Sequence, residues 1–258
     1  MKTLDYIWRL FGSAFCYAVF GIMGLVMGLL LFPMLFVLYS DSGERKNAAR
    51  GLIGRAFRGF VWLMKTVGVM DYRIEGAEHI ACRPNQLIVA NHPTLIDVVI
   101  LISLFPQANC VIKSAVTRNI FMRNTVAAAD YISNDEPDAL LESCIRYIES
   151  GGSLMLFPEG TRTRQGAPLV FEPGAAAVAT RSGAEILPVA IRCEPVFLTR
   201  QMAWHYVPPS KPEFTIRVMP PVSVDELVMT NDTERQTRLN LNDELLKIIG
   251  QSIDTMAV

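Results

Sequence analysis

A histidine and a carboxylate lie close together in the segment Asn91-His92-Pro93-Thr94-Leu95-Ile96-Asp97, directly after the apolar run 86–90. On one continuous helix, His92 and Asp97 would lie roughly 140° apart around the axis and would not touch. Proline favours the first position of a helix, so we expect a helix to begin at Pro93 and His92 to stay outside it, free to fold back toward Asp97. A carboxylate on one ring nitrogen would leave the other nitrogen as a proton acceptor. The pattern predicts a general base oriented by an acid, and it is equally typical of a histidine that only caps a helix.

A second polar segment follows the apolar run 153–157. It reads Pro158-Glu159-Gly160-Thr161-Arg162-Thr163-Arg164. The glycine lets the backbone approach a ligand, and the hydroxyl and guanidinium groups are suited to a phosphate or a polar headgroup. Loops at strand ends are where α/β proteins usually build their sites. If the two apolar runs are parallel strands, His92 and Arg162 face the same crevice.

The elements that position these segments alternate from about residue 70 onward, with short apolar runs followed by helical patterns. This alternation predicts an α/β fold with a mixed, largely parallel sheet flanked by helices. The expected strands are 72–74, 87–90, 110–113, 153–157, 186–191 and 214–218. The expected helices, whose ends are approximate, are 93–104, 137–149, 174–181 and 232–251.

An apolar stretch precedes this body, because no charged residue occurs between Arg9 and Asp41. As a straight helix the stretch would be roughly 46 Å long, more than the roughly 30 Å hydrocarbon core of a bilayer, so it must tilt, kink or turn back. We expect either one tilted or kinked span or a hairpin within one leaflet. Basic residues are more numerous after the stretch than before it, which predicts that the body of the protein lies on the cytoplasmic side. We expect the membrane to be the inner or plasma membrane.

The segment 47–65 has an apolar helical face opposite several basic residues. A helix lying in an anionic membrane interface has this pattern, and so does a helix packed on a globular domain by its apolar face. We expect two parts. Residues 1–66 form the membrane segment with an interfacial helix, and residues 67–258 form the α/β domain.

Composition excludes several classes of function. The chain is 51% hydrophobic and 19% charged with a net charge of −1, which argues against disorder and against bulk electrostatic binding of nucleic acid. The five cysteines are scattered without a CxxC pair and there are only three histidines, so we expect no metal site. No Gly-x-Ser-x-Gly elbow occurs, which favours chemistry without a covalent enzyme intermediate.

The two polar segments resemble two blocks of a known family. Residues 91–97 resemble the HX4D block of the glycerolipid and lysophospholipid acyltransferases, and residues 157–162 resemble their FPEGTR block. Residues 187–191 resemble the apolar, proline-containing block that follows, and residues 111–114 resemble the lysine-bearing strand end between the two. The resemblance extends from about residue 72 to about residue 218 and also suits an N-terminal membrane helix.

The resemblance implies acyl transfer from a thioester, acyl-CoA or acyl carrier protein, to a hydroxyl of lysophosphatidate or a related lyso-lipid. It places the protein in phospholipid biosynthesis, with membrane lipids and the acyl donor as its partners and no further cofactor. His92 would take the proton from the acceptor hydroxyl, and Asp97 would stabilise the resulting imidazolium.

The family pattern also assigns the binding residues. The acceptor headgroup would be held by Glu159, Gly160, Thr161 and Arg162, with Arg162 pairing any phosphate. Lys113 is a further candidate, near the oxyanion that develops on the thioester or near the charge of the acceptor. A solvated lysine at a strand end explains Lys113 equally well.

Two departures from the family pattern bear on the acceptor. Relatives that acylate lysophosphatidate usually carry an arginine at the end of the strand before the second long helix, where this chain reads Asp130-Tyr131-Ile132-Ser133-Asn134-Asp135. Glu172 stands where a basic residue is common ahead of Gly174. Both departures remove positive charge near the headgroup pocket. A specialised, non-phosphatidate lipid acceptor therefore stays open, as do a thioester hydrolase and a non-catalytic membrane adaptor on the same fold.

Overall fold

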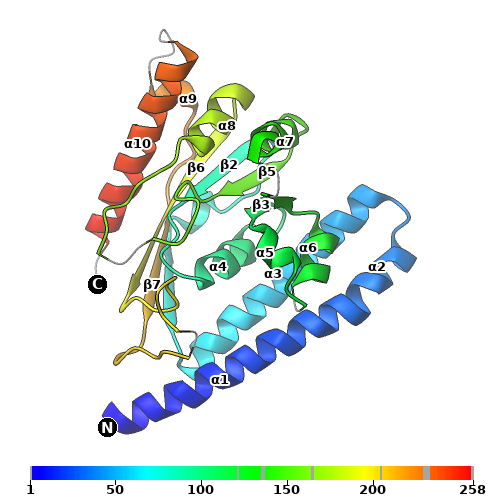
Figure 1. Cartoon of the computed structure of the whole chain (residues 1–258), viewed down its shortest axis with the longest axis vertical. Helices are drawn as coiled ribbons and strands as arrows, with labels where there is room; N and C mark the ends of the chain where they lie inside the picture. Colours follow the sequence, from blue (N-terminus) through cyan, green and yellow to red (C-terminus); the bar gives the residue numbers. More distant parts are fainter. Residues whose placement is uncertain are drawn as a thin grey trace.

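The computed structural model describes residues 2–120, 122–134, 137–163, 166–203, 205–228 and 233–256. Within these residues the strands form one sheet in the order β1-β7-β6-β2-β5-β3-β4. The strands are β1 Asp71–Glu75, β2 Gln86–Ala90, β3 Asn109–Ile112, β4 Ile132–Ser133, β5 Ser153–Leu156, β6 Glu185–Glu194 and β7 Glu213–Val218. The strands β6, β2, β5, β3 and β4 run parallel, whereas β7 is antiparallel to β6 and pairs in parallel with β1. The expected mixed, largely parallel sheet is confirmed (Figure 1).

Helices cover both faces of this sheet. They are α1 Lys2–Val26, α2 Phe32–Leu38, α3 Ser42–Val67, α4 Ile96–Leu104, α5 Ser114–Thr117, α6 Arg123–Ala129, α7 Pro137–Glu149, α8 Gly174–Ser182, α9 Val224–Leu227 and α10 Glu234–Thr255, with a π-helical turn η1 Met27–Leu31 and a 3-10 turn η2 Ala77–His79. The helices α7, α8 and α10 pack on one face, and α1, α3, α4 and α6 lie over the other (Figure 1).

The central strand β2 shows why the sheet is buried on both sides. Its residues Ile88 and Ala90 join the core under α3 and α4, whereas Leu87 and Val89 join the core under α7, α8 and α10. All four side chains are fully buried. A strand covered on both faces by helices is expected to be a continuous apolar run, and this burial fixes the position of the loop that follows Ala90.

Two features of the body differ from the sequence predictions. The helix α4 begins at Ile96, so the expectation that it begins at Pro93 is wrong. The strand β4 is absent from the strands predicted by apolar runs, because two residues paired with the edge of β3 are too few to produce a periodic pattern. The last long helix begins at Glu234, and the expected start at Asp232 lies outside the described residues.

The N-terminal apolar stretch forms one continuous helical run. Thr3–Leu38 is the one helix in the described residues that is long and apolar enough to cross a membrane. Many of its apolar side chains are exposed, among them Leu29, Leu30 and Val37. The run does not turn back within the stretch 10–40, so the structure has one long helix there and no hairpin. The π-helical turn η1 is an irregularity within this helix. The chain then returns through α3, beside α1 (Figure 1).

The helix α3 packs on the body of the protein by its apolar face. It is capped by Asp41, whose carboxylate accepts a hydrogen bond from the backbone N–H of Glu44, and it ends at Gly68 in a left-handed conformation. Ile53 and Phe57 are buried in the core against α4 and α1. The apolar face of α3 is therefore covered by protein. This matches the alternative in which the helix packs on the globular domain and does not lie in a membrane interface.

A buried arginine attaches α1 to the loop before β7. Arg9 is 1% exposed and donates hydrogen bonds to the carbonyl oxygens of Pro208 at 2.7 Å, Pro209 at 2.8 Å and Ser210 at 3.0 Å. Its Nε also donates to the carboxylate of Asp5 at 3.0 Å. Since the buried guanidinium is paired on several sides, the first turns of α1 have a defined position on the α/β body.

Candidate active site

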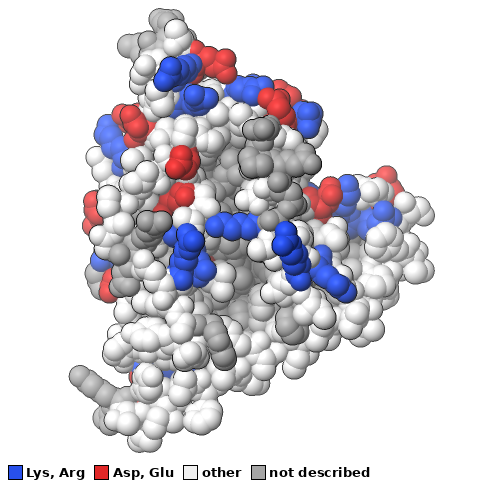
Figure 2. Space-filling view, in the orientation of Figure 1, with Lys and Arg blue, Asp and Glu red and all other residues white. Residues whose placement is uncertain are grey.

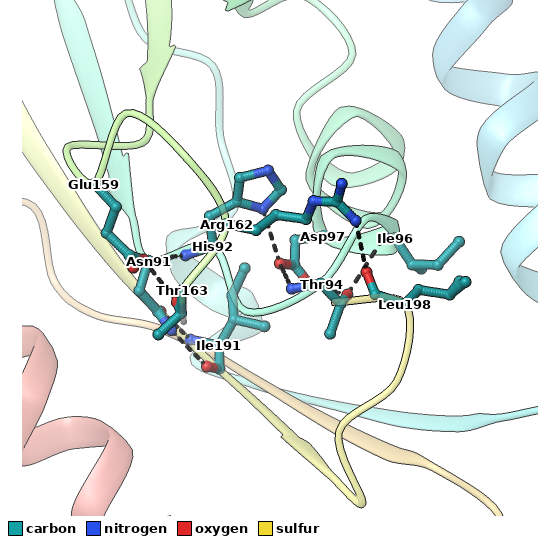
Figure 3. A network of polar contacts seen from close by, with 10 residues as sticks. All are labelled: Asn91, His92, Thr94, Ile96, Asp97, Glu159, Arg162, Thr163, Ile191 and Leu198. Atoms are coloured by element: carbon teal, nitrogen blue, oxygen red, sulfur yellow. Dashed lines mark hydrogen bonds and ion pairs between the residues drawn. The ribbon is translucent and has the colours of Figure 1, made fainter. Parts of the chain in front are cut away.

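The site lies at the carboxyl ends of β2 and β5, which are adjacent and parallel. Two hydrogen bonds join the loops that follow these strands. The backbone N–H of His92 donates to Oε1 of Glu159 at 2.7 Å, and the backbone N–H of Thr163 donates to the carbonyl oxygen of His92 at 2.8 Å. The two polar segments found in the sequence are therefore in direct contact, as Figure 3 shows.

The imidazole of His92 folds back onto Asp97, as expected. Its Nδ1 lies 3.0 Å from Oδ2 of Asp97, and the carboxylate is fully buried. Asp97 also accepts hydrogen bonds from the backbone N–H and the hydroxyl of Thr94, each at 2.6 Å. A carboxylate beside Nδ1 favours the tautomer that carries its proton on Nδ1, which leaves Nε2 with a free lone pair. An imidazole oriented in this way can act as a general base.

The start of α4 explains how Asp97 reaches His92. The hydroxyl of Thr94 accepts a hydrogen bond from the backbone N–H of Ile96 at 3.2 Å, while Asp97 accepts from the backbone N–H of Thr94. This reciprocal pattern resembles a capping box, in which a hydroxyl residue precedes a helix and an acidic residue three positions later reaches back. It places the helix start after Thr94, which is why Pro93 lies in the turn and not in the helix.

The ring of His92 is held from its face as well as from its edge. It stacks on the ring of Phe157 with the centroids 4.4 Å apart. The preceding Asn91 is buried and exchanges two hydrogen bonds with the backbone of Ile191 on β6, at 2.7 and 2.8 Å. The side chain of His92 keeps 14% exposure, and no hydrogen bond joins its Nε2 to any described residue. Nε2 is thus the part of the ring that a substrate hydroxyl can reach.

Glu159 connects the two loops. Its Oε1 accepts hydrogen bonds from the backbone N–H of His92 and, at 3.0 Å, from the hydroxyl of Thr163. Burial raises the pKa of Glu159, and these two hydrogen bonds oppose the rise. The contacts give Glu159 a positioning role on the loop of His92, and its expected contact with the acceptor headgroup stays a prediction.

The turn after β5 presents Gly160, Thr161 and Arg162. Gly160 is exposed with φ +61°, a left-handed conformation that suits glycine, and a Cβ there would meet open space. The guanidinium of Arg162 donates to the carbonyl oxygen of Leu198 at 2.9 Å, and its side chain extends past His92 (Figure 3). Burial lowers the pKa of Arg162, with a further contribution from the nearby charge of Arg200. A cation therefore lies in the immediate surroundings of the imidazole.

Lys113 is placed at the same edge of the sheet but farther along it. It follows β3, which lies on the side of β5 away from β2, and its side chain is exposed. No hydrogen bond or ion pair joins it to His92 or Arg162. Arg164 lies outside the described residues. The expected role of Lys113 beside the thioester stays a prediction.

The sequence predictions missed two residues of the 195–200 loop, Leu198 and Arg200. Leu198 has φ +53°, an uncommon conformation for a leucine, and its carbonyl oxygen accepts from Arg162 and also from the backbone N–H of Leu95 at 3.1 Å. No sequence signal marks a leucine in this conformation. Thr94, by contrast, could have been found, because Thr94-x-x-Asp97 is the spacing of a capping box.

The cysteines provide no activated nucleophile. Burial raises the pKa of the Cys110 thiol to about 12 and of the Cys144 thiol to about 11, and it also raises the pKa of Cys82 and Cys193. A catalytic cysteine needs a lowered pKa, so these thiols are unsuited to attack on a thioester. Across the described ranges, no group of three histidine, cysteine or acidic side chains could hold a metal ion.

Comparison with known proteins agrees with the family resemblance of the two polar segments. Residues 71–192 match the family model described as Acyltransferase. A 1-acyl-sn-glycerol-3-phosphate acyltransferase of Limnanthes douglasii is 27% identical over 223 residues, which cover 82% of this chain and 73% of that protein. A protein of the same name from Borreliella burgdorferi is 30% identical over 124 residues, which cover 46% of this chain and 50% of that protein. The chain spans about half the length of several curated relatives it matches.

A solved structure shares the whole fold. The crystal structure of the 1-acyl-sn-glycerophosphate acyltransferase of Thermotoga maritima superposes with a TM-score of 0.75 over 98% of this chain and 99% of that chain. The two sequences are 17% identical over this match, so the likeness concerns the fold.

Proposed function

Because this chain belongs to the Acyltransferase family, of the glycerolipid type, we propose that it transfers a fatty acyl group from a thioester to a hydroxyl of a lysophospholipid. The observation that carries the proposal is the His92–Asp97 pair, in which Nδ1 of His92 lies 3.0 Å from Oδ2 of Asp97 and the side chain of Arg162 extends past the imidazole (Figure 3). The leading acceptor is a 1-acylglycerol-3-phosphate, the substrate named for its relatives. The donor is acyl-CoA or an acyl carrier protein.

In the proposed reaction, Nε2 of His92 accepts the proton of the acceptor hydroxyl as its oxygen attacks the thioester carbonyl carbon. Asp97, paired with Nδ1, stabilises the imidazolium that forms. Collapse of the tetrahedral intermediate breaks the C–S bond, and the proton on His92 passes to the departing thiolate. The products are an ester and a free thiol, and no acyl-enzyme forms, in agreement with the raised pKa of the buried thiols.

The remaining groups have supporting roles in this proposal. Arg162 pairs with the acceptor phosphate, and the open turn at Gly160 leaves room for the headgroup. Lys113, at the end of β3, stabilises the oxyanion or the acceptor charge. The exposed apolar run Thr3–Leu38 attaches the protein to a membrane, with the α/β body on the cytoplasmic side.

The test is an assay of the purified protein in detergent with labelled acyl-CoA, labelled acyl carrier protein and a panel of lyso-lipids. A new ester supports the proposal. Free fatty acid alone identifies a thioester hydrolase, in which water replaces the alcohol, and absence of any turnover identifies a non-catalytic protein. The donor that supports turnover resolves the choice between the two thioesters.

His92→Ala is expected to lower kcat by about 10² to 10⁴ because it removes the general base. His79→Ala is the matched control, because His79 is partly exposed in η2, away from the site. The His79→Ala variant should have the activity of the wild type. Thermal unfolding should be similar for both variants. More than about a tenth of the wild-type rate in His92→Ala would contradict the role of His92 as base.

A further inference from the structure

The loop 195–200 brings a second guanidinium to the proposed headgroup site. This loop follows β6, and Nη1 of Arg200 donates to the hydroxyl oxygen of Thr161 at 3.4 Å. The adjacent Arg162 donates to the carbonyl oxygen of Leu198 on the same loop. Each segment therefore donates one hydrogen bond to the other, and these two bonds hold the loop against the turn that follows β5. Arg162 and Arg200 lie on these two neighbouring segments.

The two arginines repel each other. Arg200 contributes to the lowered pKa of Arg162, second to burial. Within the described parts of the chain, neither guanidinium forms an ion pair with a carboxylate. Asp97 is the acidic group that acts on Arg162, but its oxygens are occupied by Thr94 and His92. Like charges held together without a counterion are stabilised by an anion that binds both, and a phosphate accepts hydrogen bonds from several guanidinium N–H groups.

The backbone at Leu198 reinforces this arrangement. Its left-handed conformation directs a single carbonyl oxygen to both Arg162 and the backbone N–H of Leu95, which lies between His92 and Asp97 in the chain. Strained residues of this kind persist where the surrounding structure holds them, and they occur preferentially at functional sites. The position of Arg162, and of the loop that carries Arg200, is thus defined relative to the general base.

The sheet order explains how Arg200 replaces a missing charge. The family pattern places an arginine at the end of the strand that corresponds to β4, where this chain has the uncharged Ser133 and Asn134. In the order β6-β2-β5-β3-β4, the strand β4 lies on one side of the β2–β5 pair and β6 lies on the other. The loop after β6 therefore supplies positive charge from the opposite side. Figure 2 shows a band of basic side chains across the middle of the face that is turned toward the viewer.

We propose that Arg200 acts with Arg162 to bind the phosphomonoester of the acceptor, so that Arg200 determines specificity for an anionic headgroup. The proposal rests on the proposed function and narrows its acceptor to lyso-lipids with a terminal phosphate. It also accounts for a phosphate site in a chain that lacks the two basic positions of the family pattern.

The kinetic test compares Arg200→Gln with the wild type on two acceptors that differ only in the phosphate, 1-acylglycerol-3-phosphate and the matching monoacylglycerol. We expect KM for the phosphate-bearing acceptor to rise about tenfold or more, with kcat changed less than about threefold, because a charge-assisted hydrogen bond to the headgroup is lost. KM for monoacylglycerol should not change. Arg200→Lys should restore part of the affinity, and Arg235→Gln, at an exposed position in α10, should leave both acceptors unaffected.

Equal losses on both acceptors, or a fall in kcat alone, would show that Arg200 only supports the loop and would overturn the proposal. An unchanged KM would overturn it as well. A binding measurement separates this failure from failure of the proposed function. Titration of lysophosphatidate into His92→Ala and into His92→Ala/Arg200→Gln requires no turnover, and we expect the dissociation constant to be about tenfold higher in the double variant. Equal dissociation constants contradict the role of Arg200, whatever reaction the wild type performs.

Discussion

At the scale of single residues, the carboxylate of Asp97 satisfies a helix start and an imidazole at the same time. Oδ2 accepts from the backbone N–H of Thr94 and lies against Nδ1 of His92, while Oδ1 accepts from the hydroxyl of Thr94. The orientation of His92, the proposed general base, therefore depends on the first turn of α4. Substitutions that disturb this turn should reduce activity even when His92 and Asp97 are both present.

Glu159 gives a prediction on pH dependence. Because burial raises its pKa above the ordinary value of 4.5, the folded protein favours the neutral carboxyl group. The stability that follows from this preference is fully present below pH 4.5 and is lost as pH rises through the raised folded pKa. Glu159→Gln keeps an acceptor oxygen for His92 and Thr163 but cannot ionise. We expect its melting temperature to equal that of the wild type at low pH and to exceed it increasingly toward neutral pH.

Glu159→Ala is the contrasting variant. It leaves the backbone N–H of His92 and the hydroxyl of Thr163 without their acceptor, which should cost about 1–3 kcal/mol and lower kcat. If Glu159 instead acts through its charge on the acceptor, Glu159→Gln will raise KM for the acceptor as much as Glu159→Ala does. Melting temperatures across a pH series, together with KM and kcat of both variants, distinguish the two roles.

At the scale of elements, the close approach of α3 and α4 depends on Gly54. A Cβ at this position would overlap Cβ of Pro106 and lie 3.3 Å from the carbonyl oxygen of Ile102. Gly54→Ala should therefore push the helices apart and cost about 1–3 kcal/mol of unfolding free energy. Gly59→Ala is the control in the same helix, because its Cβ meets open space, and it should stabilise α3 by about 1 kcal/mol. Thermal unfolding of both variants measures the difference, and equal melting temperatures would refute the steric argument.

The elements that could be predicted from sequence were those with a strong local pattern. The buried run of β2 and the polar segment after it led to the correct strand and to the contact between His92 and Asp97. The proline signal places the start of α4 too early, because the hydroxyl of Thr94 competes with it for the first turn. For α3, amphipathicity alone does not distinguish a membrane surface from a protein core, since both bury the same face.

Contacts between loops distant in sequence could not be predicted. Arg200 lies far along the chain from Thr161, and nothing in the residues around either one indicates that they meet. Their contact follows from the order of β6, β2 and β5 in the sheet and from the backbone conformation at Leu198. The strand order and this backbone conformation are properties of the folded chain, and no periodic pattern in the sequence indicates them.

At the scale of the whole molecule, Arg9 joins the N-terminal helix to the α/β body. Arg9→Met would leave the carbonyl oxygens of Pro208, Pro209 and Ser210 without this donor, and the loss at the buried Pro208 costs about 1–3 kcal/mol. We expect a clear fall in melting temperature and faster proteolysis of α1. Asp5→Ala removes only an exposed partner of Arg9 and should cost about 0–1 kcal/mol. Equal stability of the two variants would refute the role of Arg9.

The same attachment bears on how a soluble form of the protein could be prepared. Removing the residues up to Leu38 would take away more than an exposed apolar helix, because it would uncover the apolar face of α3 and remove the hydrogen bonds that Arg9 donates to the loop before β7. A water-soluble version is better obtained by replacing the outward-facing residues of the first helix with polar ones and leaving Arg9 in place.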